Sequence, residues 1–145
     1  MLNPPVYAAL VGGLLIILQA LLMLSAGGYR GRNRKAVGVD GDVTLERLVR
    51  RHGNLAENAA IFIVVLGLYE ILVGSTWLVS SLAAVFLIAR LSHAVAFSSA
   101  AGSHMQGAEG GGRVFLLLRM IGAGFTALSF VVLGVALVIA VLPML

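Results

Sequence analysis

Residues 46–58 read ERLVRRHGNLAEN, and residues 59–69 continue without a break as AAIFIVVLGLY. A dense cluster of charged and amide side chains therefore runs directly into an apolar helix of the kind that crosses membranes. At about 100° of rotation per residue, four polar side chains fall on one helix face: Glu46, Arg50, Asn54 and Glu57. Ionisable groups inside a hydrophobic layer are costly unless they pair or line a wet cavity, so this polar stripe predicts a functional site.

The composition argues against an ordinary soluble domain. Of the 145 residues, 60% are hydrophobic and 11% are charged, whereas charged residues make up about a quarter of a typical soluble domain. The length suits a single transmembrane domain spanning residues 1–145. The chain has no cysteine, which excludes a disulfide framework and a thiolate metal site, so any thiol chemistry needs a thiol supplied by a ligand.

Four apolar segments predict an all-α, integral membrane four-helix bundle. The segments, each long enough to cross the hydrocarbon layer, cover about residues 4–26, 44–73, 77–98 and 113–142. Asp42 or Thr44 is expected to cap the second helix, and Trp77 to anchor the third at the membrane interface. A Gly- and Ser-rich linker at 98–112 separates the last two helices. A signal peptide is disfavoured for the first segment, because no basic region precedes it and its apolar run is too long.

The distribution of positive charge predicts the orientation in the membrane. Seven of the ten lysines and arginines lie between Arg30 and Arg51, while the second connection is short and uncharged. By the positive-inside rule, the first and third connections are expected in the cytoplasm and both termini outside. In a membrane protein, a cluster of positively charged residues indicates the membrane topology rather than nucleic-acid binding.

Two more polar features interrupt the apolar helices. Arg90, His93 and Phe97 are spaced i, i+3 and i+7 and share one face of the third helix. Arg119 lies in an apolar run near the start of the fourth helix. Because all these side chains lie toward helix ends that meet the cytoplasmic connections, we expect one cavity, walled by the second, third and fourth helices and open to the cytoplasmic half.

The charges of this expected cavity favour an anionic ligand. Three arginines, Arg50, Arg90 and Arg119, exceed the two carboxylates of the stripe, and the planar guanidinium fork suits carboxylate groups. Glu57 is then the natural partner of an ammonium group on the ligand. The alternative is that the arginines snorkel, or pair with Glu46 and Glu57 to lock the helices together.

Other polar residues carry weaker signals. Arg51 lies off the stripe, so contact with solvent or lipid headgroups is favoured over ligand binding. The histidines His52, His93 and His104 lack the spacing of metal ligands, which argues against a metal site. Glu70 lies near the opposite end of the second helix and is expected in the membrane interface.

The polar stripe also carries a family resemblance. The motif Glu46-Arg47-x-x-Arg50-x-His52-x-Asn54-x-x-Glu57 resembles the signature of the MAPEG family, the membrane-associated proteins in eicosanoid and glutathione metabolism. Arg90-x-x-His93 and Arg119 resemble the remaining polar positions of that family, and the resemblance spans the whole chain. It implies a homotrimer of four-helix bundles, with glutathione bound between neighbouring subunits.

The resemblance implies a role for each matching residue. Five residues would bind glutathione: Arg50, Asn54, Glu57, Arg90 and His93. Three would support them: Glu46, Arg47 and Phe97. Arg119 would be the catalytic residue, because a cation beside the sulfur favours the thiolate, which is the attacking form.

Five positions depart from the animal members of the family. Two of them are Asn58 and Ala59, which stand where an aromatic residue and a proline often follow the glutamate. Phe97 stands in place of a tyrosine, Gly53 in place of a basic side chain and Met120 in place of a serine. These departures argue against eicosanoid synthesis and resemble the bacterial branch. The expected location is therefore a bacterial inner membrane, with the site open to the cytoplasmic side.

The expected function is that of a membrane-bound, glutathione-dependent transferase or peroxidase acting in detoxification on lipophilic electrophiles or hydroperoxides. Its expected partners are glutathione as co-substrate, a lipophilic small molecule and membrane lipid, with no metal and no nucleic acid. The alternative is a non-catalytic lipid-binding or scaffold protein of the same family. A small transporter is disfavoured, because the first helix holds only Gln19 where a transporter would be expected to place an acidic residue.

Overall fold

The computed structural model describes residues 3–99 and 112–145, and within them the chain folds into helices joined by short connections. Four long helices follow one another, with a short 3-10 helix at the end: α1 (Val6–Arg32), α2 (Val43–Val73), α3 (Trp77–Ala96), α4 (Gly112–Val141) and η2 (Leu142–Met144). The long helices are each long and apolar enough to cross a membrane. The predicted all-α, four-helix membrane fold is therefore confirmed, while the expected linker at 98–112 lies almost wholly outside the described residues.

Helix α1 extends further than its sequence suggests. An end near Ala26 is predicted, but the helix continues through Gly27 and Gly28 to Arg32. Arg30 and Arg32 lie in its last turn, where positive side chains interact favourably with the helix dipole. The extension carries these basic side chains past the apolar segment that would cross the membrane.

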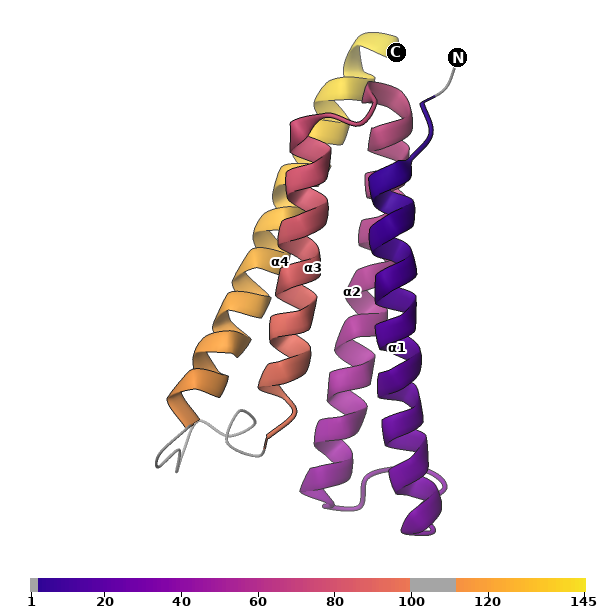
Figure 1. Ribbon diagram of the computed structural model, residues 1–145, viewed down its shortest axis with the longest axis vertical. Coiled ribbons are helices and arrows are strands. Elements are labelled where there is room, and N and C mark those ends of the chain that lie inside the picture. The colour runs from indigo at the N-terminus through magenta and orange to yellow at the C-terminus, as the bar shows by residue number, and fades with distance from the viewer. Residues whose placement is uncertain (1–2, 100–111) are drawn as a thin grey trace.

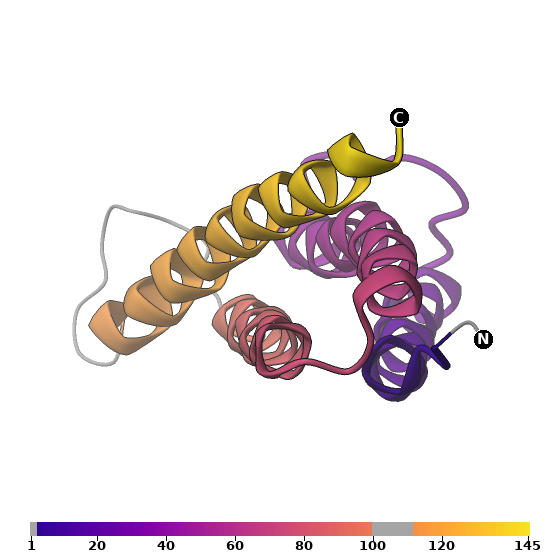
Figure 2. The same cartoon turned by 90° about the horizontal axis from the view of Figure 1, so that it is seen from above.

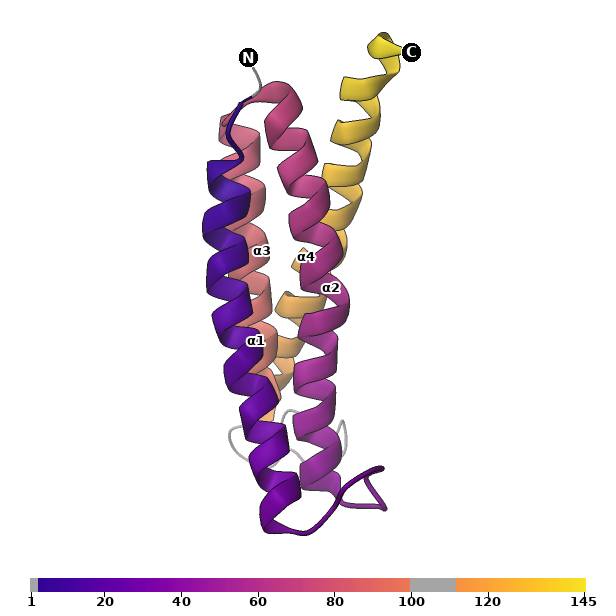
Figure 3. The same cartoon turned by 90° about the vertical axis from the view of Figure 1, so that its right-hand side faces the viewer.

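The helices run side by side along the long axis of the molecule. Both termini lie at one end, and the connection between α1 and α2 lies at the other (Figure 1). Helices α1 and α2 form one antiparallel pair, which Figure 3 shows from the side, and α3 and α4 form another. Seen from above, α4 crosses obliquely, so that its first turns project away from α2 (Figure 2). The first turns of α4 therefore lie farther from α2 than its later turns do (Figure 2).

Aromatic stacking joins the two pairs, and a close contact at a glycine joins α3 to α4 within the second pair. The rings of Phe62 on α2 and Phe86 on α3 stack with centroids 3.7 Å apart, and Phe130 on α4 lies 6.0 Å from each. Helices α3 and α4 meet at Gly122, where a Cβ atom would lie 2.9 Å from both the Ala89 carbonyl oxygen and the His93 Cβ. Small residues permit this approach, as is common between membrane helices.

Asp42 begins α2 and also organises the connection before it. Its Oδ1 accepts hydrogen bonds from the backbone N–H groups of Thr44 (3.1 Å) and Leu45 (3.0 Å), which have no partner within the helix. Lys35 Nζ lies 2.9 Å from its Oδ2, and the Tyr29 hydroxyl donates to the same oxygen at 3.1 Å. Of the two residues predicted to cap α2, Asp42 is the N-cap.

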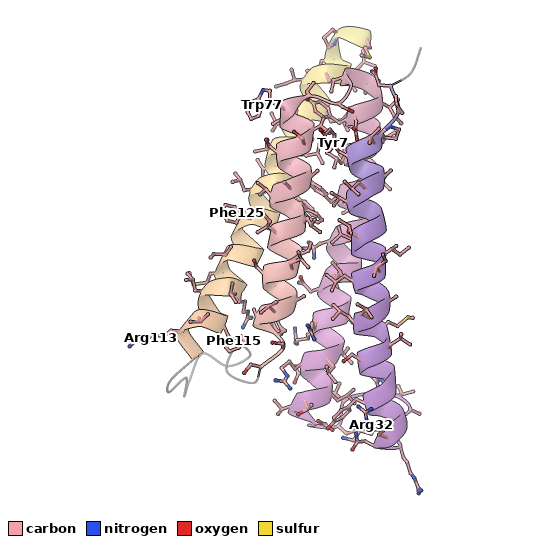
Figure 4. The ribbon with its side chains drawn as sticks, viewed as in Figure 1. Tyr7, Arg32, Trp77, Arg113, Phe115 and Phe125 are labelled. Carbon is pink, nitrogen blue, oxygen red and sulfur yellow. The ribbon has the colours of Figure 1, made fainter. Side chains whose placement is uncertain are left out.

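Glu70 occupies a different environment from the one predicted. The sequence favours an interfacial side chain, but Glu70 is fully buried between α2 and α1. Its carboxylate accepts hydrogen bonds from the backbone N–H groups of Tyr7 (3.1 Å) and Ala8 (2.9 Å) and from the Ser75 hydroxyl (2.7 Å). A carboxylate from α2 thus satisfies the free N–H groups at the start of α1. Tyr7 and the exposed Trp77 mark this end of the molecule in Figure 4.

Candidate functional site

A cavity of about 640 Å³ opens toward the end of the bundle that carries the α1–α2 connection. Its walls come from the first half of α2, the end of α3 and the third turn of α4. Eight of the predicted site residues line it: Glu46, Arg47, Arg50, Asn54, Glu57, His93, Phe97 and Arg119. Gly53, where the family resemblance notes a missing basic side chain, also lines the cavity. Two further lining residues, Val43 and Val49, carry no chemical signal in the sequence, because apolar side chains are common throughout these helices.

The lining carries more positive than negative charge. Three arginines stand against two glutamates. Arg50 Nε lies 3.1 Å from Glu46 Oε1, and in the described part of the chain this is the cavity's only ion pair. Glu57 has no hydrogen-bond or ion-pair partner among residues 3–99 and 112–145, and Arg47 donates only to the carbonyl oxygen of Ser98 (3.5 Å).

These contacts bear on the alternative that the arginines lock helices together through the glutamates. Glu46 and Arg50 are one turn apart on α2, so their ion pair joins no two helices. Both side chains are exposed, and exposed pairs of this kind contribute little to stability. The Glu57 carboxylate and the Arg119 guanidinium face the cavity with no ion pair among the described residues.

Arg119 lies against an aromatic ring rather than against an acid. Its Cζ is 5.0 Å from the centroid of the Phe97 ring, within the range of a cation–π interaction. The other neighbour of that ring is His93, whose imidazole stacks on it with centroids 4.8 Å apart. Phe97 is buried and forms the C-cap of α3, so the helix end fixes the ring that orients Arg119.

Arg90 does not line this cavity. It is 2% exposed and borders a smaller space of about 270 Å³ on the other side of Asn54. Asn54 and His93 belong to both spaces. Arg90 therefore does not border the main cavity, and the direct ligand contact that the family resemblance implies for it stays a prediction.

The remaining candidates lie elsewhere. Arg51 and His52 do not line the cavity, and the His52 carbonyl oxygen accepts a hydrogen bond from the Gln19 amide of α1 (3.5 Å). Arg113 points outward from the first turn of α4 (Figure 4), and Met120 is exposed. Among the described residues, no three His, Asp or Glu side chains come close enough to hold a metal ion, and His104 lies outside them.

The chain matches one known protein family over most of its length. The MAPEG family matches residues 6–141, which include all four long helices and every residue of the cavity lining. Among curated proteins, none matches the chain closely enough to count as a relative. The four candidate spans and the family match together indicate a multi-pass integral membrane protein. The resemblance seen in the polar stripe is thereby confirmed, and the chain belongs to the MAPEG family.

Proposed function

We propose that this protein is a membrane-bound, glutathione-dependent transferase or peroxidase acting on lipophilic electrophiles or hydroperoxides. The observation that carries the proposal is the arginine-rich cavity between α2, α3 and α4, where the positive charge of three arginines exceeds the negative charge of two glutamates. Glutathione carries two carboxylates and one ammonium group at neutral pH, so its net charge complements that excess. The cavity volume of about 640 Å³ lies within the range of about 300–1,000 Å³ that is usual for small-molecule sites.

Each lining group has a complementary part of the tripeptide. Arg50 uses only Nε for Glu46, which leaves both Nη groups to grip a carboxylate in a bidentate manner. Arg47 offers a second cation for the other carboxylate. Glu57 has no partner among the described residues and suits the ammonium group, while Asn54 supplies an amide donor.

Arg119 is the group that we assign to the sulfur. A guanidinium beside a thiol lowers the pKa of the thiol and favours the nucleophilic thiolate. In conjugation, the thiol loses its proton, the sulfur forms a bond to an electrophilic carbon and the leaving group departs with its electron pair. In peroxide reduction, the thiolate attacks one peroxide oxygen, the other leaves as an alcohol, and a second glutathione reduces the sulfenic acid to give the disulfide and water.

We also propose how the protein assembles and in which membrane it lies. We infer a homotrimer in which each cavity is closed by a neighbouring subunit, in a bacterial inner membrane, with detoxification of lipophilic compounds as the role. The cavity lies at the same end of the bundle as the basic α1–α2 connection, which supports an opening to the cytoplasm. A lipophilic substrate dissolved in the bilayer could then reach the sulfur laterally.

A lipid-binding scaffold without glutathione chemistry is the second candidate. Two observations favour it: Phe97 offers no hydroxyl group to the cavity, and Met120 is exposed and does not line the cavity. Such a protein would bind lipid on the apolar surfaces of α2 and α4, and its cavity would hold no thiolate.

Titration of the purified protein in detergent with glutathione separates the two candidates. We expect saturable binding, growth of the thiolate absorbance in the ultraviolet, and conjugation of a generic aromatic halide. S-methylglutathione serves as the control, because it should bind through the same carboxylates and give no thiolate signal. Absence of binding by a folded protein would reject the glutathione function, and lipid binding without a thiolate would favour the scaffold.

A further inference from the structure

The buried guanidinium of Arg90 connects three helices. From α3, its Nη1 donates to Asn54 Oδ1 on α2 at 2.7 Å. Its Nη2 donates to the Gly122 carbonyl oxygen on α4 at 3.0 Å, and also to Thr126 Oγ1. The Cζ atom lies 5.6 Å from the centroid of the Phe86 ring. A cation with 2% exposure is thus held by neutral oxygens and a ring face, with no ion pair among the described residues.

This arrangement fixes the orientation of the Asn54 amide. A guanidinium can only donate hydrogen bonds, so the amide oxygen of Asn54 must face Arg90. The amide nitrogen must then point away from Arg90, and Asn54 lines the main cavity. Its two N–H groups donate to no described residue, which leaves them for a ligand. The uncompensated charge of Arg90 also polarises the amide and strengthens these donors.

Thr126 fixes Arg90 in turn. Its hydroxyl donates to the Gly122 carbonyl oxygen at 2.6 Å, so the lone pairs of Oγ1 remain available to accept from Arg90. Thr126 is 5% exposed, and its side chain lies where α4 faces the guanidinium. Arg90 Nε already has no hydrogen-bond partner among the described residues, so loss of the Thr126 acceptor would leave a second buried N–H group of this guanidinium unsatisfied, which is costly for a charged group.

We propose that Arg90 and Thr126 are positioning residues, which hold the Asn54 amide with its donors directed into the cavity. This positioning role rests on the proposed function, because the ligand is taken to be glutathione. In this role Arg90 acts on the ligand through Asn54 and does not contact it directly. The Asn54 N–H groups, held in this way, would donate hydrogen bonds to an anionic or carbonyl oxygen of the ligand.

Three substitutions on α4 test the proposal by glutathione titration. Thr126→Val keeps the shape of the side chain and removes its hydroxyl, so we expect the Kd to rise about tenfold, which corresponds to about 1.4 kcal/mol. Thr126→Ser restores the acceptor and should bind within about twofold of the wild type. Ser129→Ala is the matched control, because Ser129 is also buried but donates only to the Phe125 carbonyl oxygen; its Kd should not change.

A second readout does not depend on glutathione. The chain has four asparagines, so selective ¹⁵N-asparagine labelling gives four side-chain amide signals, and the Asn54 signal is identified by its loss in Asn54→Asp. In the ligand-free protein we expect this signal to shift in Thr126→Val and to return toward the wild-type position in Thr126→Ser. Thermal unfolding of each variant checks that the fold is retained.

The outcomes separate the two proposals. An unmoved Asn54 signal in folded Thr126→Val overturns the positioning role, whether or not glutathione binds the wild type. A shifted signal with unchanged Kd also overturns it, because the amide would then not serve the ligand. If the wild type does not bind glutathione but the Asn54 signal shifts, the glutathione function fails while the placement of the amide by Arg90 and Thr126 stands.

Discussion

Arg119 differs from the other arginines of the cavity in what its guanidinium contacts. Arg50 pairs with a carboxylate and Arg47 donates to a backbone carbonyl oxygen, whereas Arg119 lies 5.0 Å from the Phe97 ring centroid. A ring face orients a guanidinium without neutralising it. The full positive charge of Arg119 therefore remains available to a sulfur anion, and its direction is set by the end of α3.

Replacing Arg119 by alanine should remove this stabilisation and little else. We expect the thiolate absorbance of bound glutathione to disappear and kcat to fall by about 100-fold or more, as when one electrostatic donor is removed from other active sites. KM should change less, because other residues bind the carboxylates. Arg113→Ala is the control on the same helix, since Arg113 is exposed and points outward. A folded Arg119→Ala protein with wild-type kcat would exclude the assigned role.

Between helices, Gly122 is a position of close contact of α4 with α3. A Cβ atom there would meet the Ala89 carbonyl oxygen and the backbone N and Cβ of His93 at 2.9–3.0 Å. Gly122→Ala should destabilise the fold by about 1–3 kcal/mol, which is typical of overpacking. It should also weaken ligand binding, because the same glycine supplies the carbonyl oxygen that holds Arg90. Thermal unfolding in detergent measures the first effect.

Gly124→Ala provides the comparison for that measurement. Gly124 is exposed on the same helix, and a Cβ atom there would meet no other atom within 4 Å. Since alanine favours helix formation over glycine, this variant should be at least as stable as the wild type. Equal losses in both variants would show that helix α4 is merely sensitive to substitution and that the close approach at Gly122 is unimportant.

The start of α2 should give the fold an acid-sensitive element. Hydrogen bonding from the Leu45 backbone N–H and then from Lys35 lowers the pKa of Asp42 from 3.8 to about 2. A carboxylate whose pKa is lowered on folding stabilises the fold above its unfolded pKa, and this contribution is lost as the pH falls through the folded value. The contribution of Asp42 is thus complete at neutral pH and disappears between about pH 4 and pH 2.

Asp42→Asn isolates this effect, because an asparagine caps a helix as well as an aspartate does but does not titrate. We expect the wild type to be the more stable at pH 7, because only the carboxylate pairs with Lys35. The difference in melting temperature should shrink as the pH is lowered from 4 to 2. A difference that stayed constant over this range would mean that the ion pair adds nothing to the cap.

The elements also show which features a sequence can reveal. The polar stripe was predicted because a helical period alone places Glu46, Arg50 and Asn54 on one face, and all three line the cavity. The burial of Glu70 could not be predicted, because its partners lie on α1, more than 60 residues away. Arg90 contacts Asn54 and does not line the main cavity, because of how α2 and α3 are placed against each other. No residue spacing within one helix gives that placement.

At the scale of the whole molecule, the two ends differ in chemistry. The end with the α1–α2 connection carries the basic side chains and the cavity. The opposite end carries both termini, the buried Glu70 and the exposed Trp77 (Figure 4). Large apolar side chains are exposed along the helices between the two ends, as expected for a surface in contact with lipid. Because the cavity lies at one end only, the orientation of the protein in the membrane decides which compartment supplies the polar ligand.

The absence of cysteine makes that orientation directly measurable. Val37 in the α1–α2 connection is 85% exposed and Leu145 at the C-terminus is 98% exposed, so a single cysteine at either position is open to a maleimide reagent. With a reagent that cannot cross the membrane, we expect Leu145→Cys to be labelled in intact bacterial spheroplasts, and Val37→Cys only after permeabilisation. The cysteine-free wild type gives the background. The reverse pattern would place the cavity on the outer face, away from cytoplasmic glutathione, and would contradict the proposed function even if the purified protein bound the tripeptide.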